Sequence, residues 1–257
     1  MIQKSWAIQP LIIPHLTNHT YTSEIYIHIL QIYNPLKRNL TMTKQTTISK
    51  SVSLSGVGIH TGKKVKITFK PAPANHGYAF SRIDLEGNPI INADANLVVN
   101  TKRGTNLEKN GVSIQTSEHV LAALVGLEID NVLIELNASE PPIMDGSSIY
   151  FVEALLKAGI EEQDADRYEY VVRENITFID EETGSEITVI PADNYQVTTM
   201  VDFGTKVLGT QNANLKSLAD FKESFANART FSFLHEIESL LEHGLIKGGD
   251  LNNAIVY

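Results

Sequence analysis

Hydrophobic and polar positions alternate in short stretches of the chain, and this pattern indicates β-strands. The segments 65–69 and 132–136 are rich in Val, Ile, Leu and Phe and alternate in part with polar residues. Glycine, asparagine and proline between such stretches, for example at Gly56, Gly87 and Pro89, are typical turn signals. The first half of the chain is therefore predicted to be rich in β-structure.

Two helices interrupt these strands. One is predicted at about 117–125 and the other at about 149–158, where an apolar stripe recurs at helical spacing and ends at Gly159. The residues of that stripe are Phe151, Val152, Leu155 and Leu156.

The acidic stretch 161–167 is predicted to be a solvated linker between two domains. Beyond it, strands are expected near 170–172, 187–190 and 196–203, followed by helices at 218–226 and at 233–241, the latter ending at Gly244. Strands followed by helices in each half indicate an α+β protein made of two similar layered domains. We place the first domain at 42–164 and the second at 165–257.

Residues 1–41 differ in composition from the rest of the chain. They contain three basic residues and one acid, Glu24, whereas the whole chain has a net charge of −9. A targeting sequence would show a basic start, an unbroken apolar stretch and a small-residue cleavage site, and this pattern is missing. We interpret 1–41 as an extension that is poorly ordered or not native, with translation starting at Met42.

Composition excludes several classes of protein. The acidic balance argues against a nucleic-acid partner, which would require a basic face. No apolar run approaches the ~20 residues of a membrane-spanning helix, so no transmembrane segment is expected. Because the sequence has no cysteine, a metal ion would have to be held by His, Asp or Glu.

The segment Thr116-Ser-Glu-His carries the chemistry of greatest interest. Thr116 or Ser117 can cap the following helix, which places Glu118 and His119 in its first turn. The helix dipole there favours an ionised carboxylate and a neutral imidazole, the states required of a general base and of a metal ligand. Alternatively, Glu118 only complements the dipole and His119 is an ordinary surface or core residue.

Three other segments have both a structural and a functional interpretation. Gly56-Val-Gly-Ile-His60-Thr-Gly62 is more typical of a tight β-turn than of a phosphate loop, so a nucleotide-binding or kinase-like module is a weak alternative. Pro142-Ile-Met-Asp-Gly-Ser-Ser supplies a turn and a helix cap at Ser147 or Ser148. Ala228-Arg-Thr230-Phe-Ser-Phe233 combines a hydroxyl with a cation and aromatics, and by itself reads as a strand end with core aromatics.

Taken in order, these segments resemble the UDP-3-O-acyl-N-acetylglucosamine deacetylase family. The resemblance covers about 43–257 without a break. It rests on the segments above and on further short sequences that match the family, namely Pro71-Ala-Pro-Ala-Asn75, Ile129-Asp-Asn131, Gly244-Leu-Ile-Lys-Gly-Gly249 and Ala254-Ile-Val256.

The resemblance implies an activity and a setting. Members of this family use Zn²⁺ to hydrolyse the N-acetyl group of UDP-3-O-(3-hydroxyacyl)-N-acetylglucosamine, a UDP-linked acylated amino sugar. This is the committed step of lipid A biosynthesis in the cytoplasm of Gram-negative bacteria. The implied fold has two α+β domains packed face to face, with the active site between them.

The resemblance also implies roles for individual residues. Glu118 matches the general base, His119 a zinc ligand and Thr230 the hydroxyl that stabilises the oxyanion. His60 lies at the edge of the site. The substrate-binding positions are Phe231, against sugar and nucleotide, and the walls of the acyl passage at Phe233, Ile237 and Ile246.

The chain departs from the family in its metal ligands. The family's remaining ligands and a later histidine fall beyond the point that matches Tyr257, and His76, His235 and His243 do not occupy ligand positions. Because a catalytic zinc needs three protein ligands, we expect this chain alone to bind zinc weakly and to be inactive, with its second domain incomplete. The alternative is a non-catalytic fragment that binds UDP-sugar or acyl groups. A longer gene product could also carry a fused 3-hydroxyacyl-carrier-protein dehydratase.

Overall fold

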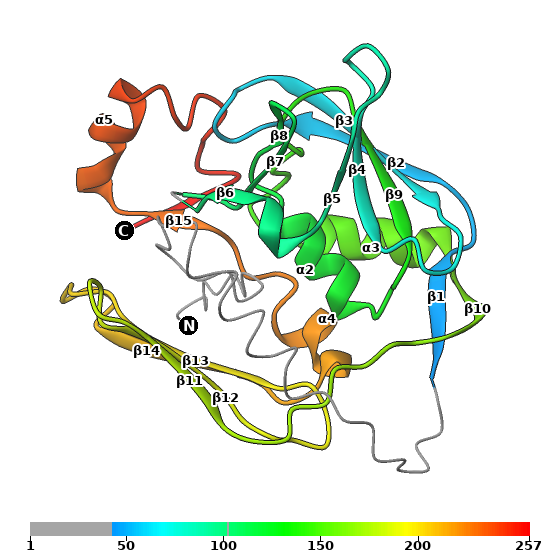
Figure 1. Cartoon of the computed structure of the whole chain (residues 1–257). Coiled ribbons are helices and arrows are strands. Elements are labelled where there is room, and N and C mark those ends of the chain that lie inside the picture. Colours follow the sequence, from blue (N-terminus) through cyan, green and yellow to red (C-terminus); the bar gives the residue numbers. More distant parts are fainter. Residues whose placement is uncertain (1–42, 102) are drawn as a thin grey trace.

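A computed structural model describes residues 43–101 and 103–257 of the chain. Its centre is a five-stranded sheet in the order β2-β3-β9-β4-β5 (Figure 1). The pairs are antiparallel except β4 with β9, which run parallel. The strands of this sheet are β2 (Val52–Val57), β3 (Lys64–Pro71), β4 (Tyr78–Arg82), β5 (Ile90–Asn92) and β9 (Val132–Leu136). Both strands predicted in this half, 65–69 and 132–136, are confirmed.

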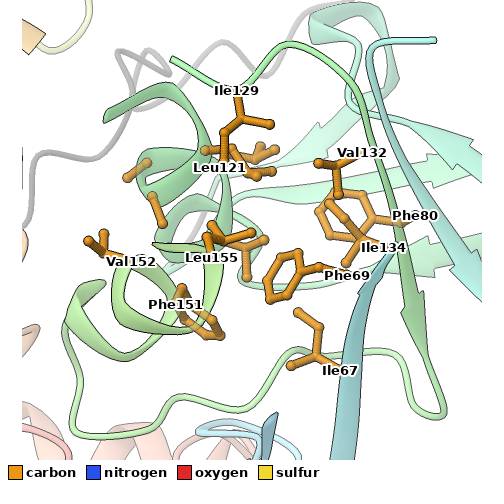
Figure 2. Close-up of a cluster of buried hydrophobic side chains, with 14 of the residues drawn as sticks. Ile67, Phe69, Phe80, Leu121, Ile129, Val132, Ile134, Phe151, Val152 and Leu155 are labelled. Carbon is orange, nitrogen blue, oxygen red and sulfur yellow. The ribbon is translucent and has the colours of Figure 1, made fainter. Parts of the chain in front are cut away.

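The sheet is covered by helices α2 (Glu118–Gly126) and α3 (Ile149–Ala158). In β3 the side chains of Val65, Ile67 and Phe69 point into the core, while Lys64 and Lys66 face solvent, as alternation requires. Figure 2 shows Phe69 beside Phe151 of α3, and their rings meet edge to face with centroids 6.2 Å apart. The two predicted helices are therefore confirmed.

One member of the predicted apolar stripe of α3 lies outside this core. Phe151, Val152 and Leu155 are fully buried, but Leu156 is 41% exposed. Consecutive residues of a helix are about 100° apart around its axis, so Leu156 projects past the edge of the face that packs on the sheet.

A three-stranded antiparallel sheet lies beside this layer and leads into α2. Its order is β6-β7-β8, and the loop from β6 to β7 contains Gly104 and Thr105. Its elements are β6 (Val98–Asn100), β7 (Asn106–Lys109) and β8 (Val112–Ile114), preceded by the short helix η1 (Ala95–Leu97).

The segment predicted as a linker is a strand. β10 (Ile160–Asp166) pairs antiparallel with β1 (Lys44–Ile48), which corrects the prediction for 161–167. Its side chains are mostly exposed, so the prediction that they are solvated is confirmed. The strand itself was missed because the backbone hydrogen bonds of a sheet do not require apolar side chains. Arg167, directly after β10, donates to Asp130 and thereby joins this edge to the loop between α2 and β9.

The second half contains two antiparallel hairpins and short helices. The strand predicted at 170–172 is wrong, because regular structure after β10 resumes only at residue 176. The strands predicted at 187–190 and 196–203 correspond to β12 and β13, whose bounds are given next. The hairpin strands are β11 (Ile176–Asp180), β12 (Ser185–Val189), β13 (Val197–Asp202) and β14 (Thr210–Leu215). After them come η2 (Leu218–Asp220), α4 (Phe221–Ser224), β15 (Phe231–Ser232), α5 (Leu234–Glu242) and β16 (Ile255–Val256), with β15 and β16 parallel.

The second half shares the hydrophobic core of the first. Val197, Leu215 and Phe221 belong to the same buried cluster as the residues of α2, and the hairpins lie beyond α2 and α4 from the five-stranded sheet (Figure 1). The α+β class is confirmed. The domain division at 164/165 stays a prediction, and the proposed extension 1–41 lies outside the described residues. No helix in the described part of the chain is long and apolar enough to cross a bilayer.

Candidate active site

Glu118 and His119 begin helix α2 and are both buried, with 3% and 7% of their surface exposed. The predicted side-chain cap is wrong. Ser117 precedes the helix but its hydroxyl donates to the carbonyl of Thr105, 3.0 Å away, and the Thr116 hydroxyl donates to Glu140. Tertiary partners have taken both hydroxyls, so the start of α2 is fixed by contacts with other loops.

The carboxylate of Glu118 faces the β6–β7 loop. Its Oε2 accepts a hydrogen bond of 2.8 Å from the backbone amide of Thr105. Its Oε1 lies 3.5 Å from the position that a Cβ atom would take on Gly104. A backbone amide holds one oxygen, and the missing side chain of Gly104 leaves the other with room beside it.

His119 sits in a setting that favours the neutral imidazole. Burial lowers the pKa of His119, and the nearby charges of Glu118 and Asp145 only partly oppose this effect. A neutral imidazole nitrogen is a metal ligand, so the local environment suits the role that the motif suggested. The backbone carbonyl of His119 accepts a hydrogen bond from the Ser148 hydroxyl at 3.0 Å.

Thr230 is joined to the same neighbourhood by the turn at 145–148. The amide of Thr230 donates to the carbonyl of Gly146 at 2.7 Å, and the carbonyl of Thr230 accepts from Ile255 at 3.0 Å. Ser148, two residues after Gly146, binds the carbonyl of His119 through its hydroxyl. One turn therefore contacts both the His119 and the Thr230 segments.

This turn also fixes the segment that carries Thr230 through a charged neighbour. The guanidinium of Arg229 donates to the carbonyl of Asp145 at 2.6 Å and to that of Leu251 at 3.2 Å. The predicted side-chain cap of α3 is wrong: the N-cap residue, Ser148, makes no capping hydrogen bond, and the hydroxyl of Ser147, one residue earlier, accepts from the amide of Ile149 at 3.2 Å. The function of this turn as a connector was not predicted from sequence.

His60 lies at the tip of the glycine-rich turn and contacts two other segments. Its Nε2 is 3.0 Å from the carbonyl of Arg103, and its Nδ1 is 3.4 Å from the amide of Ile246. A carbonyl can only accept and an amide can only donate, so these two partners match the tautomer that carries its proton on Nε2. His60 therefore connects the β6–β7 loop with the loop after α5. The same β6–β7 loop binds the carboxylate of Glu118 through the amide of Thr105.

The predicted substrate-binding aromatics form a half-buried cluster. The ring of Phe231 meets those of Phe203, Phe233 and Tyr257 edge to face, with centroids 5.4, 5.7 and 5.7 Å apart. His235 stacks on Phe233 at 5.5 Å. Such a cluster presents ring faces and edges against which an apolar chain or a planar base can pack.

The predicted passage residues Ile237 and Ile246 are partly exposed; Ile237 lies within α5 and Ile246 in the loop that follows it. Ile237 is on α5 beside Glu236, whose carboxylate accepts from the Arg103 guanidinium at 3.2 Å. Ile246 has a φ of 49° and donates its amide to His60. The structure thus places both next to residues that contact the β6–β7 loop.

Comparison with known sequences decides the family. A sequence model of the LpxC family, described as UDP-3-O-acyl N-acetylglycosamine deacetylase, matches residues 45–257. The chain belongs to the LpxC family.

Relatives with curated names agree with this assignment. A protein of Bacteroides thetaiotaomicron, named bifunctional enzyme LpxC/FabZ, is 50% identical over 215 residues, which are 84% of this chain and 47% of that protein. A Porphyromonas gingivalis protein of the same name is 46% identical, over 84% of this chain and 46% of that protein. The UDP-3-O-acyl-N-acetylglucosamine deacetylase of Myxococcus xanthus is 41% identical, over 82% of this chain and 67% of that protein. The chain thus spans about half the length of the bifunctional relatives that it matches.

The described residues do not contain a complete set of metal ligands. Within 43–101 and 103–257, no three His, Asp or Glu side chains are grouped so that they could hold a metal ion. His119, with Glu118 and Asp145 nearby, is a single candidate ligand, whereas a catalytic zinc uses three protein ligands. These residues by themselves therefore do not fit a zinc ion.

The glycine-rich turn does not offer its amides to a phosphate. The amides of His60 and Thr61 both donate to the carboxylate of Glu140, at 3.0 and 2.9 Å. Because an internal anion already occupies these donors, the nucleotide-loop alternative loses its structural basis. Glu140 itself was not identified from sequence, since a lone glutamate before Pro141-Pro142 carries no recognisable signal.

Proposed function

We propose that this chain provides the acid–base and substrate-binding part of a zinc-dependent deacetylase. In this proposal, the complete protein hydrolyses the N-acetyl group of UDP-3-O-(3-hydroxyacyl)-N-acetylglucosamine, the committed step of lipid A biosynthesis, in the cytoplasm of a Gram-negative bacterium. Membership of the LpxC family supports the reaction class. The observation that carries the proposal is that hydrogen bonds through the β6–β7 loop and the 145–148 turn join the segments of Glu118, His119, Thr230 and His60.

Glu118 is assigned the proton transfers of amide hydrolysis. A water molecule adds to the acetyl carbonyl carbon and gives one proton to the Glu118 carboxylate. The C–N bond then breaks, the proton passes from Glu118 to the departing amine, and acetate is released. The amide of Thr105 holds Oε2, which leaves Oε1 beside Gly104 for this exchange.

Thr230 is assigned to the negative charge that develops on the carbonyl oxygen. Its backbone amide and carbonyl are both used in hydrogen bonds, to Gly146 and from Ile255, which positions the backbone of the residue, and its hydroxyl is the group assigned to donate to the substrate. A pre-organised donor of this kind is worth about 3 kcal/mol in the transition state. The aromatic cluster around Phe231 and Phe233 would bind the sugar, the nucleotide and the start of the acyl chain.

Zn²⁺ is the proposed cofactor of the complete site, with His119 as one ligand and the others outside the described residues. Zinc in such a site polarises the amide carbonyl and activates water. Because His119 alone does not complete a ligand set, no step above is assigned to the metal.

Replacing Glu118 with glutamine in the full-length gene product tests this function. The change keeps the size of the side chain but removes the base, so acetate release from the UDP-linked substrate should fall about 10²–10⁴-fold. Thr230→Val should lower kcat about 10²-fold with a smaller change in KM. Glu153→Gln, an exposed carboxylate on α3, is the matched control and should leave the rate unchanged.

Metal analysis of the same proteins separates the enzyme from its alternative. Stoichiometric zinc that is lost in His119→Ala would support the proposed cofactor. Binding of the UDP-sugar without zinc and without acetate release would instead identify a non-catalytic binding fragment and overturn the proposal.

We also propose that the gene product includes a 3-hydroxyacyl-carrier-protein dehydratase. The support is that three relatives 46–50% identical to this chain are named bifunctional LpxC/FabZ enzymes, and the matched region makes up less than half of each. The mass of the native protein tests this proposal, because a product with no room for a second catalytic domain would contradict it.

A further inference from the structure

Glu140 is a buried carboxylate that the proposed reaction does not use. It follows β9, is 1% exposed and accepts four hydrogen bonds. The donors are the amide of His60 at 3.0 Å, the amide and hydroxyl of Thr61 at 2.9 and 2.8 Å, and the hydroxyl of Thr116 at 3.0 Å. No lysine or arginine among residues 43–101 and 103–257 pairs with it in the structure. The buried carboxyl group is therefore held by hydrogen bonds and not by an ion pair.

The four donors come from the two segments that carry candidate site residues. Oε2 binds Thr61, and Oε1 binds both the amide of His60 and the hydroxyl of Thr116. Thr116 lies two residues before Glu118. A single oxygen atom thus links the loop of His60 to the turn that begins helix α2.

The surrounding backbone is shaped to keep this carboxylate in place. A Cβ atom on Gly58 would overlap Oε2 of Glu140, so the carboxylate can approach the turn only because that position is glycine. Thr116 has a φ of 51°, a strained value for a β-branched residue. Such a conformation persists when its surroundings hold it, here through Glu140 at the hydroxyl and Asn106 at the amide.

We infer that Glu140 is a positioning residue that fixes His60 and the start of helix α2 relative to each other. For its effect on catalysis this inference rests on the proposed deacetylase function. Its structural part does not, because the ring of His60 offers an independent readout. The neutral Nε2–H tautomer requires the ring to stay between the carbonyl of Arg103 and the amide of Ile246, and this placement depends on the backbone of the His60 loop.

Glu140→Gln in the full-length protein tests the inference with little change in volume. Glutamine presents one oxygen and one NH₂ group in place of two oxygens. The NH₂ group must face either the donors of Thr61 or those of His60 and Thr116, and because two donors cannot pair, the segment on that side must move. We expect histidine ¹⁵N NMR to show loss of the single Nε2–H tautomer at His60. We expect kcat to fall about 10- to 100-fold while KM changes by less than about threefold, because misplaced reacting groups affect the transition state more than binding.

Thr116→Val and Thr61→Val separate the two sides of the network. Each removes hydroxyl contacts to one oxygen while the side chain keeps its shape, and Thr116→Val should lower kcat with the His60 tautomer less affected. These variants also provide the test if Glu140→Gln does not fold. Glu135→Gln is the matched control, because Glu135 is a carboxylate on β9 that pairs with Lys70 away from these loops, and it should change neither readout.

Two results would overturn the inference. One is a folded Glu140→Gln protein whose kcat and His60 tautomer match those of the parent. The other is a loss of activity that only follows the folded fraction measured by thermal unfolding. If the parent protein itself releases no acetate, the proposed function fails, and the tautomer of His60 alone then decides: a change in Glu140→Gln supports the positioning function and no change refutes it.

Discussion

Replacing Gly126 with alanine tests how the second half of the chain is joined to helix α2. Gly126 is the last residue of α2, and Phe221, the first residue of α4, is 4% exposed. A Cβ atom on Gly126 would lie 2.5 Å from Cγ and 2.6 Å from Cε1 of the Phe221 ring. Cδ1 of the ring would be closer still. Non-bonded carbons require about 3.5 Å, so the ring or the helix must move by more than about 1 Å.

The free energy of unfolding should fall despite the better helix propensity of alanine. Overpacking of this kind costs about 1–3 kcal/mol, whereas exchange of glycine for alanine in a helix gains at most about 1 kcal/mol. We expect a net loss of about 1–2 kcal/mol, which corresponds to a decrease in Tm of about 2–8 °C for a domain of this size.

Calorimetry and urea unfolding of Gly126→Ala, Phe221→Leu and the double variant measure the effect. Leucine is smaller than phenylalanine, so the double variant should be more stable than the sum of the two single changes predicts, by at least about 1 kcal/mol. A Gly126→Ala protein as stable as the parent, or strictly additive changes, would refute the reasoning.

Two further changes probe contacts around the site. Gly146→Ala combines a φ of 89° with an overlap between the new methyl group and the carbonyl of Asn253, so it should lower the free energy of unfolding in urea by about 2–4 kcal/mol. Gly184→Ala is the control: its φ is 70° but nothing lies within 4 Å of the new methyl group, so the loss should be only about 1 kcal/mol. Arg103→Gln should raise the pKa of Glu236, because the hydrogen bond from Arg103 is the main cause that lowers it. A lowered carboxyl pKa stabilises the fold above the ordinary glutamate value and this contribution is lost as the pH falls through the lowered pKa, so the variant should lose less stability in acid, and ¹³C NMR titration of Glu236 checks the shift. An unchanged pKa would contradict the pairing.

Local sequence patterns predicted much of the fold because burial and backbone preference are themselves local. The alternation at 65–69 and the stripe at 149–158 indicate directly which side faces a core; the first is strand β3 of the five-stranded sheet and the second is helix α3, which packs on that sheet. The segment 161–167 was predicted wrongly for the same reason. Its charged side chains indicate solvent correctly, but they carry no information on whether β1 lies alongside to complete a ladder.

The sequence by itself determined the family, the α+β class and the candidate residues Glu118 and His119, since these depend on residue types in short runs. Only the tertiary structure decided what holds those residues. Glu140 meets Thr61 across 79 positions and Thr116 across 24, and Arg229 meets Asp145 across 84. The residues around a hydrogen-bond acceptor in the sequence do not reveal which distant residue will donate to it. Such partners can be identified only when folding brings the two segments within about 3 Å of each other.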